Sequence, residues 1–172
     1  MTKTLPNDVY ILPRSDLIRL RILTEDVFSE TWRNEVRGDV SYLKGEQITW
    51  RGENKLLFAC PPAHKKQPFL TILSELADRN DIIRETKGVL LFLDGKPQVL
   101  PNNLVAQKPR PEGQRYISWA IFLPTQMAQA LKMADQIGGG LSPGNPVIFA
   151  GFRGMRVAEG RDKLSKFLDG CR

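Results

Sequence analysis

The stretch Asn145-Pro-Val-Ile-Phe-Ala-Gly-Phe-Arg-Gly-Met-Arg-Val-Ala-Glu-Gly160 joins a short apolar run to two glycines. Residues 147–150 are continuously apolar, which is typical of a buried strand. Gly151 and Gly154 predict a tight turn after that strand, and residues 155–159 predict the opening of a helix. The stretch therefore predicts a strand-turn-helix element near the end of the chain.

Two arginines, Arg153 and Arg156, lie in the predicted turn and first helical turn. A helix N-terminus carries partial positive charge and unpaired N–H donors, so cations are not normally placed there. Arginines at this position are explained if the site binds an anion, most often a phosphate. The alternative interpretation is a buried strand, a glycine turn and two solvated arginines.

The residues 148–159 also resemble the second conserved box of the ParB/sulfiredoxin superfamily, where an apolar strand leads into a Gly-Glu-Arg-Arg-x-Arg-Ala-Ala turn and helix. The positions that match this pattern are Gly151, Arg153, Arg156 and Ala158. Phe152 stands where the family usually has its glutamate, and Gly154 where it has a second arginine. The resemblance covers residues 124–164, and the first 120 residues match nothing in the family.

This resemblance implies a ParB/sulfiredoxin-like fold in the C-terminal part of the chain and a bound nucleotide, ATP or CTP with Mg²⁺. The residues it implies as nucleotide ligands are Gly151, Arg153, Gly154 and Arg156. Members of the superfamily bind nucleoside triphosphates, some partition DNA, and some plasmid fertility-inhibition factors are ATPases and nucleases. The implied function is a DNA-acting, nucleotide-binding protein that interferes with conjugative DNA transfer or with partition.

Glu159 is the candidate catalytic residue, because it is the acid nearest to the box in sequence. It follows Arg156 by three residues, so a helix would place both on one face, and a simple ion pair is the alternative. Phe152 in place of the family glutamate weighs against turnover. Mg²⁺ prefers oxygen ligands, and the sequence alone does not place the carboxylates that a metal site needs.

The net charge of +6 is concentrated in the second half of the chain. Residues 1–87 carry 14 basic and 13 acidic side chains, whereas residues 88–172 carry 11 and 6. A concentrated positive field favours polyanions, which predicts DNA as a partner. The candidate nucleic-acid contacts are Lys108, Arg110, Arg115, Arg161 and Lys163. The basic stretch 107–115 is equally consistent with an extended segment that binds a protein partner.

The composition predicts a single α+β domain over residues 1–172, with a mixed sheet and flanking helices. Any internal boundary falls near residues 107–115, which read as a linker. No apolar run approaches the length of a membrane span and residues 1–6 do not resemble a signal peptide, so we expect a soluble cytosolic protein without a membrane partner. Cys60 is predicted to be a small buried hydrophobe and Cys171 to be idle, which fits a reducing compartment.

Hydrophobic periodicity and turn signals predict the remaining elements. The predicted helices cover residues 24–38, 68–79, a short segment at 82–83, 124–137 and 161–168, with Gly138-Gly-Gly140 as the C-cap of the fourth. The predicted strands include 9–12, 17–23 (or a helix), a strand beginning at 42–43, and 116–123, with hairpins at 48–59 and 89–100.

Three further residues are weighed for a role in binding. His64 is interpreted as an exposed loop residue rather than a general base. Trp50 and Trp119 could stack on bases, but their apolar neighbours favour core packing. Two functions compete with the DNA-acting enzyme: a non-catalytic inhibitor or adaptor of a secretion or replication complex, and a plain nucleic-acid-binding protein.

Overall fold

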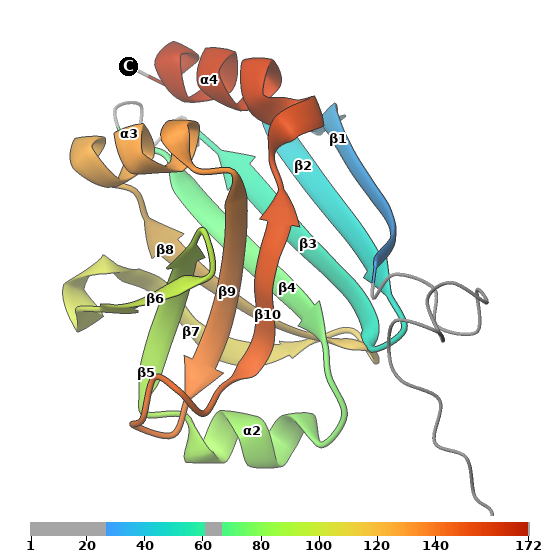
Figure 1. Ribbon diagram of the computed structural model, residues 1–172, viewed down its shortest axis with the longest axis vertical. Coiled ribbons are helices and arrows are strands. Elements are labelled where there is room, and N and C mark those ends of the chain that lie inside the picture. The colour runs from blue at the N-terminus through green and yellow to red at the C-terminus, as the bar shows by residue number, and fades with distance from the viewer. Residues whose placement is uncertain (1–26, 61–66, 172) are drawn as a thin grey trace, which may run out of the picture.

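Two antiparallel sheets face each other across a shared apolar core in the computed structural model, which describes residues 27–60 and 67–171 (Figure 1). The six-stranded sheet has the order β1 (Val27–Arg37), β2 (Val40–Thr49), β3 (Gly52–Ala59), β4 (Phe69–Glu75), β8 (Tyr116–Phe122) and β7 (Val105–Glu112). The four-stranded sheet has the order β10 (Ala150–Arg156), β9 (Gln136–Ser142), β5 (Gly88–Leu93) and β6 (Lys96–Leu100). The expected mixture of helices and strands is confirmed, but all the described strand pairs are antiparallel, so the predicted mixed sheet is wrong.

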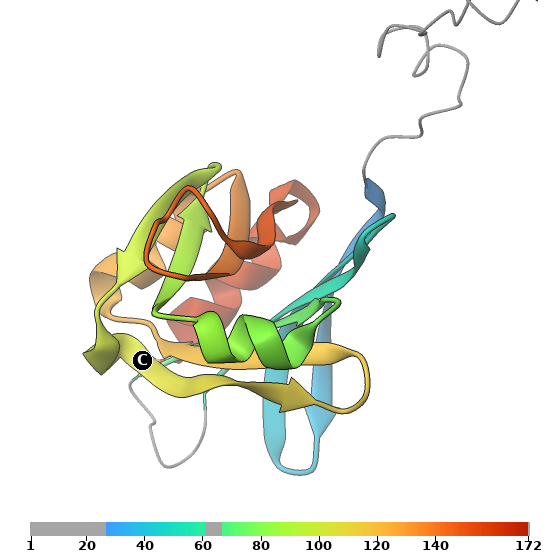
Figure 2. The same cartoon turned by 90° about the horizontal axis from the view of Figure 1, so that it is seen from below.

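The helices cover the two ends of this sandwich. α3 (Thr125–Met133) and α4 (Arg161–Gly170) lie across one end, and α2 (Arg79–Glu85) lies across the other (Figure 1). Figure 2 views the molecule from the α2 end, where this helix lies nearest to the reader. Short 3₁₀ turns at Asn102–Leu104 and Ala158–Gly160 complete the described elements. The predictions of α2, α4, strand β8 and both hairpins are confirmed.

Residues 69–75 form strand β4, so the helix predicted over residues 68–79 is wrong. Along β4 burial alternates, so that Leu70 and Ile72 are fully buried while Leu73 is only partly buried. A period of two is the signature of a strand with one face on the core. β3 and β8 flank β4 on its two sides and fix it as a central strand.

Residues 27–37 form strand β1, so the helix predicted over residues 24–38 is wrong. Residues 24–26 lie outside the described residues, as do the predicted segments at 9–12 and 17–23 and His64. Trp32 is 5% exposed, whereas Phe28 and Val36 are 56% and 71% exposed. The predicted helix required the three side chains to share a buried face, and they do not. Antiparallel pairing with β2 along most of its length holds β1 as an edge strand.

Strand β9 replaces the predicted end of the fourth helix, because α3 ends at Met133 and Gly138-Gly-Gly140 lies inside the strand. A Cβ on Gly138 would collide with the backbone of Phe152 and Arg153 in β10. A Cβ on Gly139 would lie 2.6 Å from Ile72 of the facing sheet. The glycines are therefore required for close approach within and between the sheets rather than for a C-cap.

Strand β10 also corrects the predicted strand-turn-helix element. The strand runs through the expected turn, and the next helix, α4, begins only at Arg161. Gly151 has a φ of +139°, and a Cβ there would collide with the backbone of Gly139. The glycines thus permit tight pairing with β9 across a bulge between Phe152 and Met155.

Strand β7 occupies most of the stretch 107–115 that was predicted to be a linker. Its pairing with β8 places it at the edge of the six-stranded sheet. Prolines 109 and 111 are tolerated because an edge strand leaves one row of backbone groups unpaired. Residues 113–115 form the turn into β8 rather than an extended arm.

Cys60 and Cys171 form a disulfide, with their Cα atoms 5.7 Å apart, so the prediction of two unpartnered cysteines is wrong. The bond joins the end of β3 to the residue that follows α4. Disulfides persist mainly in oxidising compartments, so the cysteines no longer argue for a reducing one. Cytosolic location remains a prediction. None of the described helices is both long and apolar enough to cross a membrane.

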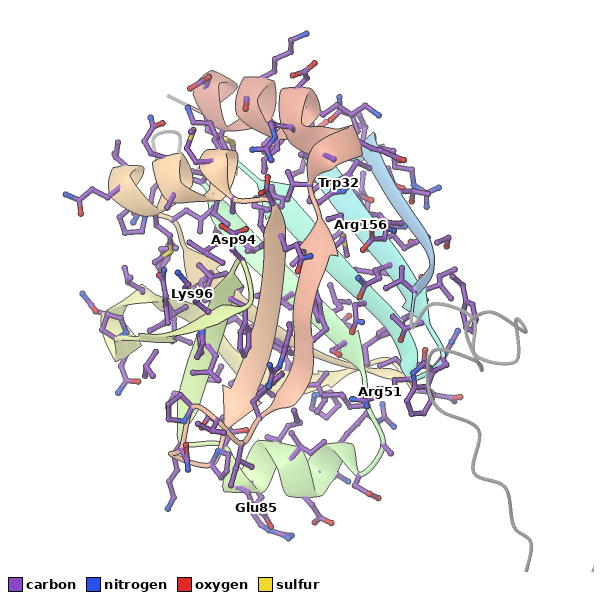
Figure 3. All side chains as sticks on the ribbon, in the orientation of Figure 1. Trp32, Arg51, Glu85, Asp94, Lys96 and Arg156 are labelled. Atoms are coloured by element: carbon purple, nitrogen blue, oxygen red, sulfur yellow. A yellow bond between two sulfur atoms is a disulfide. The ribbon has the colours of Figure 1, made fainter. Side chains whose placement is uncertain are left out.

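Trp32 connects β1 to the C-terminal part of the chain. Its indole packs against Gly160 and lies within 3 Å of the space that a Cβ on Gly45 would fill. Its Nε1–H donates a hydrogen bond of 2.8 Å to the carbonyl oxygen of Arg156, and the two residues lie close together in Figure 3. Lys163 Nζ donates to the Trp32 carbonyl oxygen at 2.6 Å. The edge strand is thereby fixed by residues from β10 and α4.

Candidate binding cleft

A cleft of about 510 Å³ opens between strand β10 and the inner face of the six-stranded sheet. Its walls come from the tip of the β2–β3 hairpin, the end of β4, and residues 149–154. Arg51 marks this hairpin tip in Figure 3. The cleft contains most of the sequence stretch that was predicted to bind a phosphate.

The floor of the cleft is a polar row made of Gln47, Asn54 and Ser74. These residues continue the inward-facing positions of β2, β3 and β4, which are apolar farther along each strand. Gln47 pairs with Asn54 in register, and Asn54 pairs with Ser74. All three are more than nine-tenths buried. The inner face of the sheet thus changes from apolar to polar where the two sheets separate.

A chain of hydrogen bonds runs along the polar row. Ser74 Oγ donates to Asn54 Oδ1 at 2.7 Å, and Asn54 Nδ2 donates to Gln47 Oε1 at 3.2 Å. Gln47 Nε2 donates to Glu30 Oε1 at 2.7 Å and to the Gly154 carbonyl oxygen at 2.9 Å. Buried polar groups are costly unless they are paired, and these bonds offset that cost. The Gly154 contact also joins the row to β10 on the other wall.

Aromatic rings and arginines surround the mouth of the cleft. Trp50 is 62% exposed, so the prediction that it packs in the core is wrong, whereas Trp119 is fully buried as predicted. The Arg51 guanidinium lies 4.8 Å from the centre of the Trp50 ring, and that of Arg153 lies 5.7 Å from the Phe149 ring. These are cation–π distances.

The charges at the mouth are not balanced within the cleft. Neither Arg51 nor Arg153 forms an ion pair with another described residue. The acid among the described lining residues, Glu75, binds Arg115 through both carboxylate oxygens at 2.9–3.1 Å. The cleft therefore presents positive charge beside an exposed aromatic ring.

The predicted nucleotide ligands separate into two groups. Gly151, Arg153 and Gly154 line the cleft, although they lie in a strand and not at a helix N-terminus. Arg156 lies outside the cleft, and its Nε donates to Glu30 Oε2 at 2.6 Å. The argument from helix geometry is therefore wrong for all four, and their role as nucleotide ligands remains a prediction.

Glu159 lies in the 3₁₀ turn before α4, where it lines a smaller hollow of about 190 Å³ with Glu30 and Arg156. Arg156 forms an ion pair with the Glu30 carboxylate. Within residues 27–60 and 67–171, no group of three His, Cys, Asp or Glu side chains could hold a metal ion. The catalytic role of Glu159 and the use of Mg²⁺ both remain predictions.

The five predicted nucleic-acid contacts do not form one surface. Lys108 and Arg110 lie on β7, Arg115 in the following turn, and Arg161 and Lys163 on α4. Four of the five bind acids or carbonyl groups of the protein: Arg110 binds Glu112, Arg115 binds Glu75, Arg161 binds Asp135, and Lys163 binds the Trp32 carbonyl. Arg115 binds Glu75, which lines the cleft.

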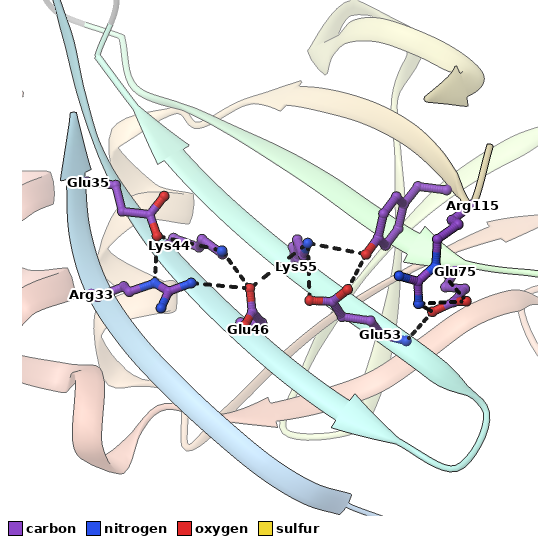
Figure 4. A network of polar contacts seen from close by, with 9 residues as sticks. Arg33, Glu35, Lys44, Glu46, Glu53, Lys55, Glu75 and Arg115 are labelled. Carbon is purple, nitrogen blue, oxygen red and sulfur yellow. Dashed lines mark hydrogen bonds and ion pairs between the residues drawn. The ribbon is translucent and has the colours of Figure 1, made fainter. Parts of the chain in front are cut away.

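The outer face of the six-stranded sheet carries a ladder of alternating charges (Figure 4). Its members are Arg33, Glu35, Lys44, Glu46, Lys55, Glu53, Tyr116, Arg115 and Glu75. Burial raises the pKa of Glu53, but hydrogen bonds from Tyr116 and Lys55 outweigh it and hold the pKa below its ordinary value of 4.5. Opposite charges across neighbouring strands stabilise the pairing, and the cations and acids of the ladder neutralise one another.

Glu53→Gln tests this ladder through its pH dependence. Because the pKa of Glu53 is lowered on folding, its charge stabilises the protein at neutral pH, and this contribution is lost as the pH falls below 4.5. We expect the variant to lose at most about 1 kcal/mol at pH 7, since the pair is partly exposed. Urea unfolding of both proteins at about pH 7 and about pH 3 measures the difference. Glu159→Gln, outside the ladder, is the control. A Glu53 difference that is as large at the lower pH would contradict the assignment.

Sequence reasoning missed the polar row and gave Trp50 the wrong environment. Asn54 lay in the predicted hairpin turn, Gln47 just before the predicted strand at Ile48, and Ser74 in a predicted helix, with nothing local to connect them. Only the register of β2, β3 and β4 brings them together. For Trp50 a signal was available, since the hairpin prediction placed this tryptophan beside the turn.

Comparison of the chain with protein-family models, curated proteins and solved structures finds no match.

Proposed function

We propose that this chain is a nucleic-acid-binding protein, and that its cleft holds nucleotides of a single-stranded segment of DNA or RNA. The observation that carries the proposal is the exposed Trp50 ring with Arg51 against it and Arg153 in the same cleft lining. Neither arginine forms an ion pair with a described acid. Proteins that bind single strands combine aromatic stacking platforms with cations that track the phosphates. A duplex presents no free base to such a ring, so the proposal is restricted to single strands.

The proposal keeps the DNA-binding part of the expectation from sequence and moves it from the β7 stretch to the cleft. The excess of basic residues after residue 87 is consistent with a polyanionic partner. A role for ATP or CTP with Mg²⁺, and the relation to the ParB/sulfiredoxin superfamily, are separate proposals that rest on residues 148–159 alone. Turnover is not part of the function proposed for the cleft.

Trp50→Ala is expected to weaken binding of single-stranded oligonucleotides by about 1–3 kcal/mol, the contribution of one stacked base. The fold should be unaffected, because the side chain is largely exposed. Fluorescence anisotropy with a labelled mixed-sequence 12-mer measures the affinity. Val99→Ala removes an equally exposed apolar side chain on β6 and is the matched control. Equal affinities of parent and Trp50→Ala would contradict the stacking role.

The same titration across a salt series separates the cleft from the β7 stretch. Removing both Arg51 and Arg153 by substitution with glutamine should lower the salt slope by about 1.4, since each phosphate contact on a single strand contributes about 0.7. Lys108→Gln with Arg110→Gln removes the same charge from β7 and should leave most of the slope in place. If the β7 pair carries the larger effect, binding occurs at the surface predicted from sequence and not in the cleft.

A protein-interaction module is the second candidate, favoured by exposed apolar residues at the hairpin end of the cleft. Phe28, Ile48 and Trp50 are all exposed, and the β1–β2 register places the first two on neighbouring strands. Interfaces are enriched in such aromatic residues. Absence of oligonucleotide binding at low salt would favour this candidate over the first.

A further inference from the structure

The direction of the hydrogen bonds along the polar row is fixed from one end. Gln47 Nε2 contacts two oxygen atoms, Glu30 Oε1 and the carbonyl oxygen of Gly154, at 2.7 and 2.9 Å. The Glu30 carboxylate also accepts bonds from the backbone nitrogen and Nε of Arg156, so it acts as an acceptor. A backbone carbonyl can only accept. Both N–H groups of the Gln47 amide are therefore used, and its Oε1 faces Asn54.

This orientation determines the rest of the row. Because Gln47 presents an oxygen, Asn54 must present its Nδ2, which donates at 3.2 Å. Asn54 Oδ1 then faces Ser74, whose hydroxyl donates to it at 2.7 Å. The hydrogen of the Ser74 hydroxyl is thereby used as well. Each residue of the row therefore donates its hydrogen bond in the direction of Glu30 and Gly154.

The hydrogen-bonding positions of the polar row that remain unused are mostly acceptors. Each amide oxygen has two lone pairs, and each amide nitrogen has two hydrogens. After the internal bonds are counted, one N–H of Asn54 remains as a donor. A lone pair remains on Gln47 Oε1, another on Asn54 Oδ1, and two on Ser74 Oγ. The floor of the cleft thus offers several acceptor positions for each donor.

We infer that the polar row makes the cleft prefer adenine and cytosine, which carry an exocyclic amino group at C6 or C4, over thymine and uracil. Adenine presents its N6 amino group and cytosine its N4 amino group, whereas thymine has the carbonyl oxygen O4 in that place. Bases of single strands are commonly read on these edges once they are unstacked. This inference rests on the proposed function, and it adds the class of base to it.

The physical basis of the preference is the cost of unmatched acceptors. The amino group of a base donates hydrogen bonds to the acceptor oxygens of the row. The base and the row therefore both keep their hydrogen bonds when the base displaces water. A carbonyl oxygen in the same place faces other oxygens, and buried acceptors without partners are penalised. Discrimination by one such contact corresponds to about a 5- to 150-fold difference in affinity.

The inference is tested with the full chain and three labelled oligonucleotides, dA12, dC12 and dT12, in anisotropy titrations at one fixed low salt concentration. We expect dA12 and dC12 to bind at least about fivefold more tightly than dT12. If all three bind and dT12 binds equally well or better, the inference is overturned while the proposed function stands. If none binds, the proposed function fails and the inference fails with it.

Gln47→Met provides the matched variant, because it keeps the length of the side chain and removes the acceptor Oε1. It also frees the Asn54 N–H that Oε1 had bound, so the floor loses an acceptor and gains a donor, and its excess of acceptors becomes smaller. We expect the ratio of dA12 to dT12 affinity to fall by at least about threefold, within the range for one base contact.

Trp50→Ala should instead weaken binding of all three oligonucleotides by similar factors. A Gln47→Met protein that folds, as judged by circular dichroism, and keeps the parent ratio would contradict the role of the row. If that variant does not fold, the ranking of the three oligonucleotides by the parent protein still decides the inference.

Discussion

Trp32→Ala is expected to lower the free energy of unfolding by about 3–5 kcal/mol, the range for deleting a large buried aromatic side chain. The indole is 5% exposed and occupies space left open by Gly45 and Gly160. Its loss removes this packing and leaves the Arg156 carbonyl oxygen without the hydrogen bond from Nε1. Both effects act at the junction of β1 with the C-terminal elements.

Urea unfolding followed by circular dichroism measures this change. Trp50→Ala is the matched control, because it makes the same substitution at a ring that is 62% exposed. The control should change stability by less than about 0.5 kcal/mol, as exposed substitutions usually do. Similar losses for the two tryptophans would show that Trp32 does not anchor β1.

Loss of the Cys60–Cys171 disulfide is expected to have an effect of comparable size. The two cysteines are 111 residues apart in sequence, so the bond closes a long loop in the unfolded chain. In the chain-entropy model, a loop of that length corresponds to about 4–5 kcal/mol of stabilisation. The free energy of unfolding should fall by about that amount when Cys60→Ser and Cys171→Ser are combined.

Unfolding in urea with and without a reducing agent tests this prediction. The reductant should lower the stability of the parent protein and leave the double-serine variant unchanged, which controls for other effects of the reagent. Mass spectrometry after alkylation of free thiols reports the disulfide directly. Stability of the parent that does not respond to complete reduction would contradict the predicted contribution.

The elements that could be predicted from sequence are those with local signals. Asp94-Gly95 specifies the turn between β5 and β6, and both residues have positive φ as such a turn requires. The apolar run of β8 was long enough to identify without knowledge of its neighbours.

The two false helices have a shared physical origin. Phe28, Trp32 and Val36 recur at intervals of four, a spacing that places residues on one side of a strand as well as on one face of a helix. The apolar residues of β4 are equally ambiguous over so short a segment. Strand pairing decides between the two conformations, and it depends on partners that lie elsewhere in the chain.

The glycines and the polar row could not be interpreted without tertiary contacts. Gly139 packs against Ile72 and Trp119 of the facing sheet, and no local rule distinguishes this role from a helix C-cap. Likewise, Gln47, Asn54 and Ser74 become neighbours only through strand register. The candidate cleft follows from these contacts, and it shares only three residues with the site predicted from sequence.

The anchoring of β1 has a consequence for the rate at which this chain folds. Trp32 bonds to a carbonyl group 124 residues later in the sequence, and its own carbonyl binds a lysine 131 residues later. Contacts of such large separation require long loops to close before they contribute stability, and domains rich in them fold in milliseconds to seconds. The first described strand therefore cannot bury its tryptophan until β10 and α4 have formed. Until then, the Trp32 ring stays exposed and can associate with apolar groups of other unfolded chains.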